Sequence, residues 1–395
     1  MNYVWEQRKL GEICSRVQGN DGRMELPTLT ISAANGWMKQ EDRFSGNIAG
    51  KEQKNYTLLH KGELSYNHGN SKLAKYGTVF SLQTYEEALV PRVYHSFKVE
   101  IGSADFIEYY FATKMPDREL RKLISSGARM DGLLNIGYDD FMGIKMMFPS
   151  VLEQDKIAEC FRAFDHLITL HQHKCDETKK LKKCMLQKMF PKNGKKVPEI
   201  RFDGFANDWE QRKLGELAEI VGGGTPSTSV DSYWDGDIDW YAPAEIGEQI
   251  YLESSQRKIT EEGLTKSSAK ILPIGTVLFT SRAGIGKTAI LLKEGCTNQG
   301  FQSIVPNKEK LDSYFIFTRS EELKRYGETV GAGSTFVEVS GKQMANMELM
   351  MPKTMPEQQQ IGEYFANLDH LITLHQHKCD ELQNLKKYML QNMFV

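Results

Sequence analysis

The sequence has no long apolar run, few cysteines and no excess of charge of either sign. No stretch of roughly 18 or more apolar residues occurs, so we expect no membrane-spanning helix. The first residues, Met1 to Glu6, lack the basic and apolar regions of a secretory signal peptide. The six cysteines form no Cys-x-x-Cys pair, which favours reduced thiols and a cytoplasmic location. The net charge of −2 lacks the basic excess of many stand-alone nucleic-acid binders, so DNA contacts would need local positive charge or partner subunits.

Catalytic motifs are also missing. The sequence contains neither a Gly-x-Ser-x-Gly elbow nor the Asn/Asp-Pro-Pro-aromatic run of amino-methyltransferases. Acidic pairs such as Glu86-Glu87 and Asp139-Asp140 have no evident catalytic partner and are interpreted as solvated surface residues. The chain is therefore predicted to be a binding protein and not, by itself, an enzyme.

One loop resembles a phosphate-binding motif in part. Gly286-Lys287-Thr288 matches the end of a phosphate-binding loop, but that pattern begins with a glycine where this chain has Ser281. An NTPase is kept as a minor alternative, and the exposed Arg282 and Lys287 suit DNA phosphates or base edges instead. A plain surface turn is the other alternative for this loop.

Histidines and a cysteine cluster in one stretch, at His166, His171, His173 and Cys175, and recur further along the chain. Their spacing does not complete a typical zinc ligand set, because His173 faces away from the others on a helix. We interpret them as polar packing residues and expect no metal.

The most informative positive feature is a long internal repeat. Trp5 to Glu12 recurs letter for letter as Trp209 to Glu216, and Asp165 to Glu177 recurs as Asp369 to Glu381, both 204 positions later. The segments between these matches, roughly residues 13–150 and 217–353, share almost no sequence. The chain therefore consists of two equal halves, each a divergent body followed by a shared helical element.

The shared element is predicted to be a long helix in both copies. Residues 156–190 contain neither glycine nor proline, apolar residues recur at spacings of three and four, and about 35 residues would extend for roughly 50 Å. We expect the two copies to pair as antiparallel helices; the alternative is that each helix packs only on its own body. The residues expected to form the helix–helix or subunit interface are Leu167, Leu170, Leu181, Met185, Leu371, Leu374, Leu382, Leu385 and Met389.

The bodies are predicted to be mixed in secondary structure. Short β-like runs such as residues 237–241 and 275–280 alternate with stretches that look helical, such as 106–124 and 314–325. The fold class is therefore α+β: two globular domains joined by two long, coiled-coil-like antiparallel helices with pseudo-two-fold internal symmetry. The predicted first globular domain is residues 1–152, followed by a central long helix and linker at 153–195. The predicted second globular domain is residues 196–355, followed by a C-terminal long helix at 356–395.

A family resemblance emerges in the second body. Gly222 to Ser227, with the sequence Gly-Gly-Gly-Thr-Pro-Ser, precedes the aromatic-flanked run from Tyr233 to Pro243. This string resembles the start of a target recognition domain in the specificity subunit of a type I restriction-modification system. The Trp-Glu-Gln-Arg-Lys-Leu-Gly-Glu opening of each half and the loop from Ser281 to Lys287 resemble the same family. The first body lacks the glycine-rich string and has Ser65 to Gly77 in place of the second body's loop, so it resembles a different subtype.

The resemblance implies a non-catalytic, DNA-reading subunit. Each target recognition domain would read one half of a bipartite, asymmetric target in double-stranded DNA. The helices would act as a spacer and as a dock for two methyltransferase subunits, with two restriction/translocase subunits in the full complex. S-adenosylmethionine, ATP and Mg²⁺ would be bound by those partners and no cofactor by this chain. The rival interpretation is a structural or adaptor protein without a DNA role.

Candidate DNA contacts are polar side chains in predicted exposed loops, since arginine and lysine suit guanine whereas asparagine and glutamine suit adenine. The candidates are Tyr66, Asn67, Lys72, Lys75 and Arg129 in the first body and Thr225, Ser227, Arg282, Lys287 and Ser334 in the second.

Overall fold

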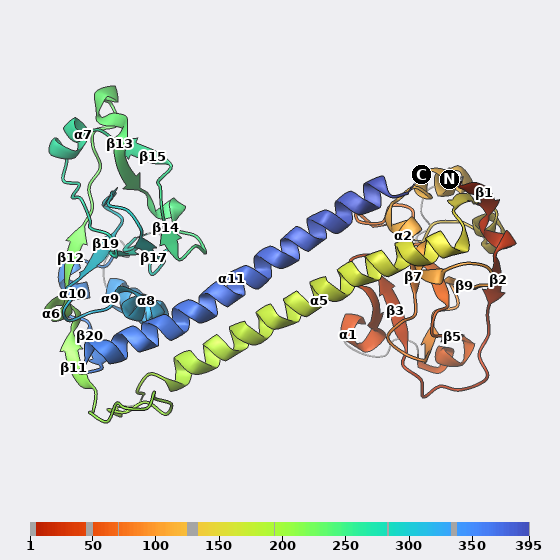
Figure 1. Ribbon diagram of the computed structural model, residues 1–395, viewed down its shortest axis with the longest axis horizontal. Helices are drawn as coiled ribbons and strands as arrows, with labels where there is room; N and C mark the ends of the chain where they lie inside the picture. The colour runs from red at the N-terminus through yellow and green to blue at the C-terminus, as the bar shows by residue number, and fades with distance from the viewer. Residues whose placement is uncertain are drawn as a thin grey trace. The chain divides into compact units, whose positions relative to one another are not determined.

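The computed structural model describes residues 5–44, 50–69, 71–124, 133–192, 194–282, 284–332 and 338–394 (Figure 1). The chain divides into two compact units. Unit 1 comprises Met1–Gln172 and His377–Val395, and unit 2 comprises His173–Gln376. Both units combine helices with sheets whose strands pair mainly antiparallel, so the predicted α+β class is confirmed.

Unit 1 is built around a four-stranded antiparallel sheet. Its order is β2 (Cys14–Val17), β9 (His95–Val99), β6 (Leu64–Asn67) and β7 (Thr78–Ser81). Three two-stranded ladders surround it: β1 (Glu6–Lys9) with β10 (Lys145–Phe148), β3 (Leu29–Ser32) with β4 (Gly36–Lys39), and β5 (Thr57–His60) with β8 (Glu87–Val90). Its short helices are α1 (Gln40–Phe44), α2 (Ala104–Ala112), α3 (Asp117–Leu123) and α4 (Tyr138–Met142).

Unit 2 has a five-stranded sheet in the order β12 (Ala218–Gly222), β19 (Gln302–Pro306), β16 (Val277–Phe279), β17 (Thr288–Leu291) and β14 (Tyr251–Leu252). A second sheet contains β15 (Arg257–Ile259), β13 (Trp234–Tyr241) and β18 (Cys296–Thr297), and β11 (Glu210–Lys213) pairs with β20 (Glu348–Met351). The short helices are α6 (Leu214–Leu217), α7 (Glu261–Thr265), α8 (Ser313–Thr318), α9 (Ser320–Gly331) and α10 (Gly341–Ala345).

The two units share a sheet order that their sequences conceal. In unit 1 the order β2-β9-β6-β7 matches β12-β19-β16-β17 in unit 2, and every pairing between these strands is antiparallel. The repeated Glu-Gln-Arg-Lys segment forms β1 in one unit and β11 in the other, each pairing with the strand that precedes a long helix. The internal repeat therefore extends from the shared elements into the divergent bodies.

The long helices are α5 (Val151–Lys188) and α11 (Met355–Asn392), and each contributes to both units. They run antiparallel, because contacts join early residues of one helix to late residues of the other. In unit 1 the Nζ of Lys386 lies 2.5 Å from the Oδ1 of Asp165, and in unit 2 the Nζ of Lys182 lies 2.6 Å from the Oδ1 of Asp369. The predicted antiparallel pairing is confirmed, and the alternative, packing of each helix on its own body alone, is wrong.

The least exposed side chains on each helix follow a seven-residue repeat, as in a coiled coil. On α5 one such row contains Phe161, Ile168, Cys175 and Lys182. The sulfur of Cys175 lies 3.8 Å from the carbonyl oxygen of Ile372, and the repeat-related Cys379 lies 3.6 Å from that of Ile168. Each of these two cysteine side chains contacts the backbone of the other helix, so the helices lie close together at this seam.

Six of the nine predicted interface residues lie outside this seam. They form three repeat-related pairs of leucines, each 37–51% exposed: Leu167 with Leu371, Leu170 with Leu374, and Leu181 with Leu385. Leu382 is buried, and Met185 and Met389 pack against the cores of units 2 and 1. The exposed leucines therefore do not hold the helix pair together, and a subunit interface is the part of the prediction that stays open for them.

Aromatic side chains fasten the helices to the body cores. In unit 1, Phe161 of α5 and Phe394, just after α11, have ring centroids 5.8 Å apart. Their repeat equivalents in unit 2, Phe365 and Phe190, lie 6.1 Å apart. Each body thus receives the start of one long helix and the end of the other.

Candidate nucleic-acid interface

The glycine-rich segment of unit 2 follows β12 and passes very close to a neighbouring backbone. A Cβ on Gly223 would lie 2.0 Å from the carbonyl oxygen of Asn298, and one on Gly224 would lie 2.3 Å from the Oγ of Ser268. The amide of Gly224 donates to the carbonyl of Thr297 at 2.8 Å. Only glycine fits at these two positions, because any side chain would push the two segments apart.

Two tryptophans of β13 hold the same segment in place. The indole N–H of Trp240 donates to the carbonyl of Gly224 at 2.8 Å, and that of Trp234 donates to the carbonyl of Ser227 at 3.1 Å. The two rings meet edge to face at 5.1 Å, and the guanidinium of Arg257 stacks 3.6 Å from the Trp234 ring centroid. The backbone that carries Thr225 and Ser227 is therefore preorganised.

A third segment, residues 297–300, brings predicted contacts from two loops together. The Oγ1 of Thr225 donates to the side-chain oxygen of Gln299, and the amide of Ser281 donates to the carbonyl of Gly300 at 2.8 Å. Thr225 and the Arg282 loop thus flank one exposed amide side chain, that of Gln299. Gln299 is not among the contacts predicted from the sequence, although two amide side chains followed by a glycine, Asn298-Gln299-Gly300, could have indicated it.

The loop from Ser281 to Lys287 is a hairpin loop between antiparallel strands β16 and β17. The hydroxyl of Thr280 donates to the carbonyl of Gly284 at 2.8 Å and accepts from the amide of Lys287 at 3.0 Å. Phosphate-binding loops lead into a helix whose N-terminus faces the phosphates, whereas Thr288 begins a strand here. The local structure therefore argues against the NTPase alternative.

The cations of this hairpin differ in their surroundings. Arg282 is exposed and lies 2.8 Å from the Oε1 of Glu338, a solvent-facing ion pair that contributes little to stability. Lys287 is also exposed.

The remaining candidates of unit 2 are two serines. Ser227 lies on the surface with its hydroxyl 2.8 Å from that of Ser229, and Ser334 lies outside the described residues.

In unit 1 the candidates lie on the β6–β7 hairpin, which occupies the same place in the sheet as the β16–β17 hairpin of unit 2. Lys72 and Lys75 are exposed on this loop. Asn67 is half-buried at its start, where its amide donates to the carbonyl of Ile31 at 3.2 Å. Arg129 lies outside the described residues.

Tyr66 occupies the core instead of the surface. Its ring stacks on Phe141 with centroids 4.3 Å apart, and its hydroxyl donates to the carbonyl of Tyr76 at 2.6 Å. Burial raises the pKa of Tyr66 above its usual range. The ring also closes over Gly77, where a Cβ would lie 2.5 Å from it. Tyr66 is therefore a packing residue that shapes the hairpin. Its prediction as a DNA contact is wrong, because the side chain is buried.

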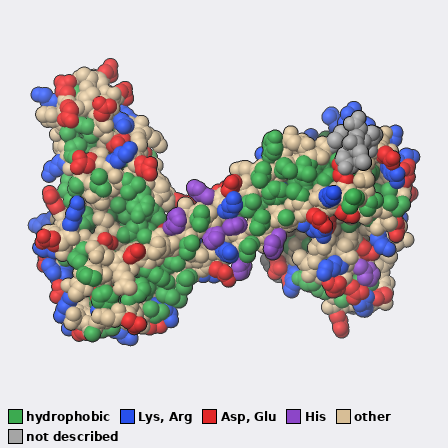
Figure 2. All heavy atoms as spheres, viewed as in Figure 1, with side chains coloured by type: hydrophobic (Ala, Val, Ile, Leu, Met, Phe, Trp, Pro, Cys, Tyr) green, Lys and Arg blue, Asp and Glu red, His purple; other side chains and the backbone are tan. Residues whose placement is uncertain are grey.

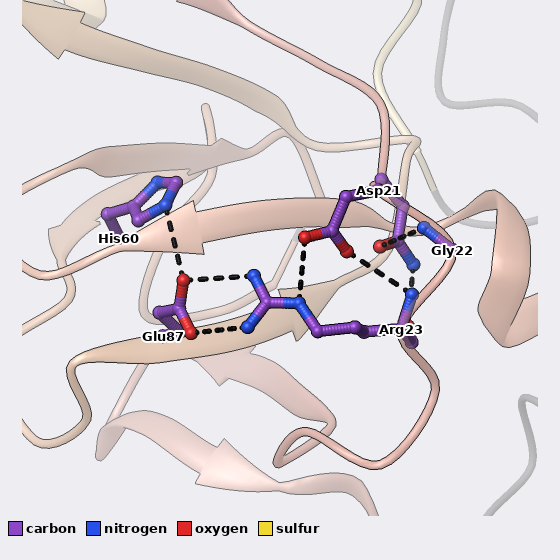
Figure 3. Close-up of polar contacts among 6 residues, drawn as sticks. Asp21, Gly22, Arg23, His60 and Glu87 are labelled. Carbon is purple, nitrogen blue, oxygen red and sulfur yellow. Dashed lines mark hydrogen bonds and ion pairs between the residues drawn. The ribbon is translucent and has the colours of Figure 1, made fainter.

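A surface network fixes the segment that leads into β3 (Figure 3). The guanidinium of Arg23 binds both oxygens of Glu87, at 2.7 and 3.0 Å, and its Nε donates to Asp21 at 2.7 Å. His60 approaches the same Glu87 carboxylate at 3.4 Å. The hydrogen bond from Arg23 lowers the pKa of Glu87. This arginine is occupied by carboxylates and is poorly suited to bind DNA.

The repeated histidines lie on the helical segments, where Figure 2 shows histidine side chains gathered at the surface. Across the part of the chain that the structure describes, no three His, Cys, Asp or Glu side chains come together as metal ligands. His173 instead pairs with Glu177 one turn later, at 3.4 Å. Among the described helices, none combines the length and apolar character needed to cross a bilayer.

Comparison with known proteins finds similarity to one family over part of the chain. Residues 206–384 match the family described as type I restriction modification DNA specificity domain. The chain is 34% identical over 191 residues to the MjaIX specificity subunit of Methanocaldococcus jannaschii, covering 48% of this chain and 44% of that relative. It is 29% identical over 170 residues to the EcoR124I/EcoR124II specificity subunit of Escherichia coli, covering 41% of each chain. These matches span about half the length of the curated relatives.

The fold comparison covers more of the chain. The S subunit of a type I restriction-modification system from M. genitalium superposes with a TM-score of 0.64 at 13% identity, covering 100% of this chain and 97% of that one. The fold is therefore shared across both units. Residues 206–384 match the type I restriction modification DNA specificity domain, and the chain is similar to the specificity subunits of type I restriction-modification systems.

Proposed function

We propose that the chain is the DNA-reading subunit of a type I restriction-modification complex and that each unit reads one half of a split, asymmetric target. The observation that carries this proposal is the shared sheet order with unlike hairpins. Both units present a loop at the same position, but one carries Lys72 and Lys75 and the other carries Arg282 and Lys287. Two similar scaffolds with different polar loops suit two different half-sites.

The partners and cofactors belong to the same proposal. Two methyltransferase subunits would dock on the long helices, and two restriction/translocase subunits would complete the assembly in the cytoplasm. The three pairs of exposed leucines support a docking role, because repeat-related apolar side chains at the surface of a helix pair suit two equivalent partners. S-adenosylmethionine, ATP and Mg²⁺ would be bound by these partners.

The docking proposal is tested by replacing the exposed leucines. Leu167→Asp combined with Leu371→Asp should abolish co-purification with a co-expressed methyltransferase subunit while the fold persists, since both side chains lie outside the helix seam. The exposed polar pair Thr169→Asp and Thr373→Asp is the matched control. Loss of binding in both variants, or in neither, would contradict a leucine-dependent dock.

The adaptor interpretation is kept as the alternative from another class. An adaptor would neither copurify with a methyltransferase subunit nor bind duplex DNA. The match of residues 206–384 to a DNA specificity domain favours the DNA-reading function.

A further inference from the structure

A cavity of ≈ 680 Å³ opens in unit 1 next to the hairpin that carries Asn67. Its walls mix cations, amides and aromatic rings, which is the chemistry that recognises nucleobases. They include Gln40, Arg43, Tyr56, Asn67, Arg92 and Tyr94. Glu52 also lies on the wall, where its carboxylate accepts a hydrogen bond from Asn55 at 2.8 Å.

Arg43 is held in a defined orientation on this wall. Its Nη1 donates to the carbonyl of Ile31 at 2.8 Å and lies 3.4 Å from the hydroxyl of Thr30. That hydroxyl in turn lies 2.9 Å from the hydroxyl of the buried Tyr94. Among the described residues, the hydrogen bonds of Arg43 all use Nη1, which leaves the Nε and Nη2 edge of the guanidinium for a ligand.

One backbone oxygen accepts hydrogen bonds both from Arg43 on the cavity wall and from the start of the β6–β7 loop. The carbonyl oxygen of Ile31 accepts from Arg43 and also from the amide of Asn67, at 3.2 Å. Arg43 therefore lies beside Asn67, the last residue of β6, where the β6–β7 hairpin loop begins; this hairpin corresponds in the sheet to the Arg282 hairpin of unit 2.

A buried acceptor on the same wall has no partner among the described residues. The side chain of Gln40 is 2% exposed and donates to the hydroxyl of Tyr56 at 3.2 Å, but its Oε1 accepts no hydrogen bond. Buried polar atoms are rarely left in this state, so Oε1 is suited to receive an N–H donor from a ligand. In the major groove, the guanine edge offers two acceptors and the cytosine amino group offers a donor.

We propose that the mouth of this cavity faces the major-groove edge of a G·C base pair in the first half-site and that Arg43 determines specificity there by binding guanine through its Nε and Nη2 edge. The inference rests on the proposed DNA-reading function and goes beyond it by naming the site and the base. Arg23 in the same unit provides the contrast, because its guanidinium is already held by Glu87 and Asp21.

The experiment compares the modified-base motif of the wild type with those of Arg43→Ala, Arg43→Lys and the control Arg23→Ala, each co-expressed with the methyltransferase subunit. Lysine keeps the charge but loses the bidentate fork, so both Arg43 variants should relax one G·C position of the first half-site. Discrimination at that position should fall by about 5- to 150-fold, the equivalent of one bidentate contact. The second half-site and the Arg23→Ala motif should stay unchanged.

Several results would overturn the inference. An unaltered motif in a folded Arg43→Lys variant contradicts the guanine contact while leaving the proposed function standing. Weaker modification by Arg43→Ala with full activity and the same motif for Arg43→Lys would reduce Arg43 to a phosphate contact and also contradict it. If the wild type modifies no split motif and binds no duplex, the proposed function itself fails. Should Arg43→Ala not fold, Arg43→Lys alone decides.

Discussion

Glu108 of α2 is partly buried against the β7 strand of unit 1. One carboxylate oxygen accepts from the hydroxyl and the amide of Ser81, at 2.6 and 2.8 Å. The two hydrogen bonds lower the pKa of Glu108, but burial raises it by more, and the nearby carboxylates of Asp105 and Asp165 raise it further. The pKa therefore rises from 4.5 to about 7. Unit 1 therefore keeps a proton on this side chain over a pH range in which the unfolded chain has lost it.

This shift predicts a pH-dependent stability. Below pH 4.5, Glu108 is protonated in both the folded and the unfolded chain, so its contribution to the stability of unit 1 is fully present. This contribution is lost as the pH rises through about 7, the pKa of Glu108 in the folded state. The linked slope is at most about 1.4 kcal/mol per pH unit. Glu108→Gln should raise the unfolding midpoint of unit 1 more at pH 8 than at pH 5, measured by thermal melting. Glu159→Gln, an exposed acid on α5, is the control, and equal shifts at both pH values would refute the assignment.

The sequence identified some of these individual residues and missed others for a physical reason. Lys72, Lys75 and Arg282 lie on exposed hairpins, as loop composition indicated. Tyr66 was misjudged because an aromatic residue before a polar loop suits either a surface or a core. Arg43 and Gln299 were missed because their neighbours in space, Ile31 and Thr225, are distant in sequence.

At the scale of elements, the long helices carry a repeated three-residue contact. In unit 2, Asp369 accepts from the hydroxyl of Tyr314 at 2.8 Å and from Lys182 at 2.6 Å. In unit 1, Asp165 accepts from Tyr109 at 2.8 Å and from Lys386 at 2.5 Å. Each contact ties a body helix to both long helices, but the side chain of Asp369 is 10% exposed and that of Asp165 is 45% exposed.

The difference in exposure predicts unequal effects of one substitution at two repeat-related sites. Asp369→Asn should destabilise unit 2 by about 2–3 kcal/mol, because a buried charge-assisted hydrogen bond is lost. Asp165→Asn should cost unit 1 about 1 kcal/mol or less, since water screens its partner. Urea unfolding measures both, and a larger loss for Asp165→Asn would contradict the argument.

We propose that the length of the two long helices sets the length of the DNA spacer between the two half-sites. A seven-residue insertion after Gln172 together with one after Gln376 preserves the heptad seam, so it should lengthen the spacer in the modified motif. Seven residues keep each side chain on its face, whereas a three-residue insertion in both helices breaks the seam and should abolish modification. An unchanged spacer in an active seven-residue variant would refute this role.

Element prediction succeeded where the pattern was long. The absence of glycine and proline and the 3–4 spacing predicted both helices and their pairing, but the packed row passes through Ile168 and Cys175, one position off the leucines. Leucine frequency misleads there, because the packed row of α5 contains Phe161, Ile168, Cys175 and Lys182 and no leucine. The stretch 106–124 is two helices, α2 and α3, separated at Lys114, whose φ of 67° breaks the helix.

For the whole molecule, the repeat predicted two halves, and the shared sheet order extends that symmetry to bodies without sequence similarity. Strand order depends on pairings between distant residues, so the sequence alone could not reveal it. Two scaffolds with the same sheet order and unlike hairpins support the proposal of two independent readers in one chain.

The most direct test of this account is modified-base mapping in cells that express the chain with its methyltransferase subunit, as wild type and as Arg282→Ala. We expect one split motif with two unlike halves for the wild type. Arg282→Ala should change one half of the motif only, and Lys72→Ala combined with Lys75→Ala should change the other half. A symmetric or continuous wild-type motif, or variants from the two units that alter the same half, would contradict this account.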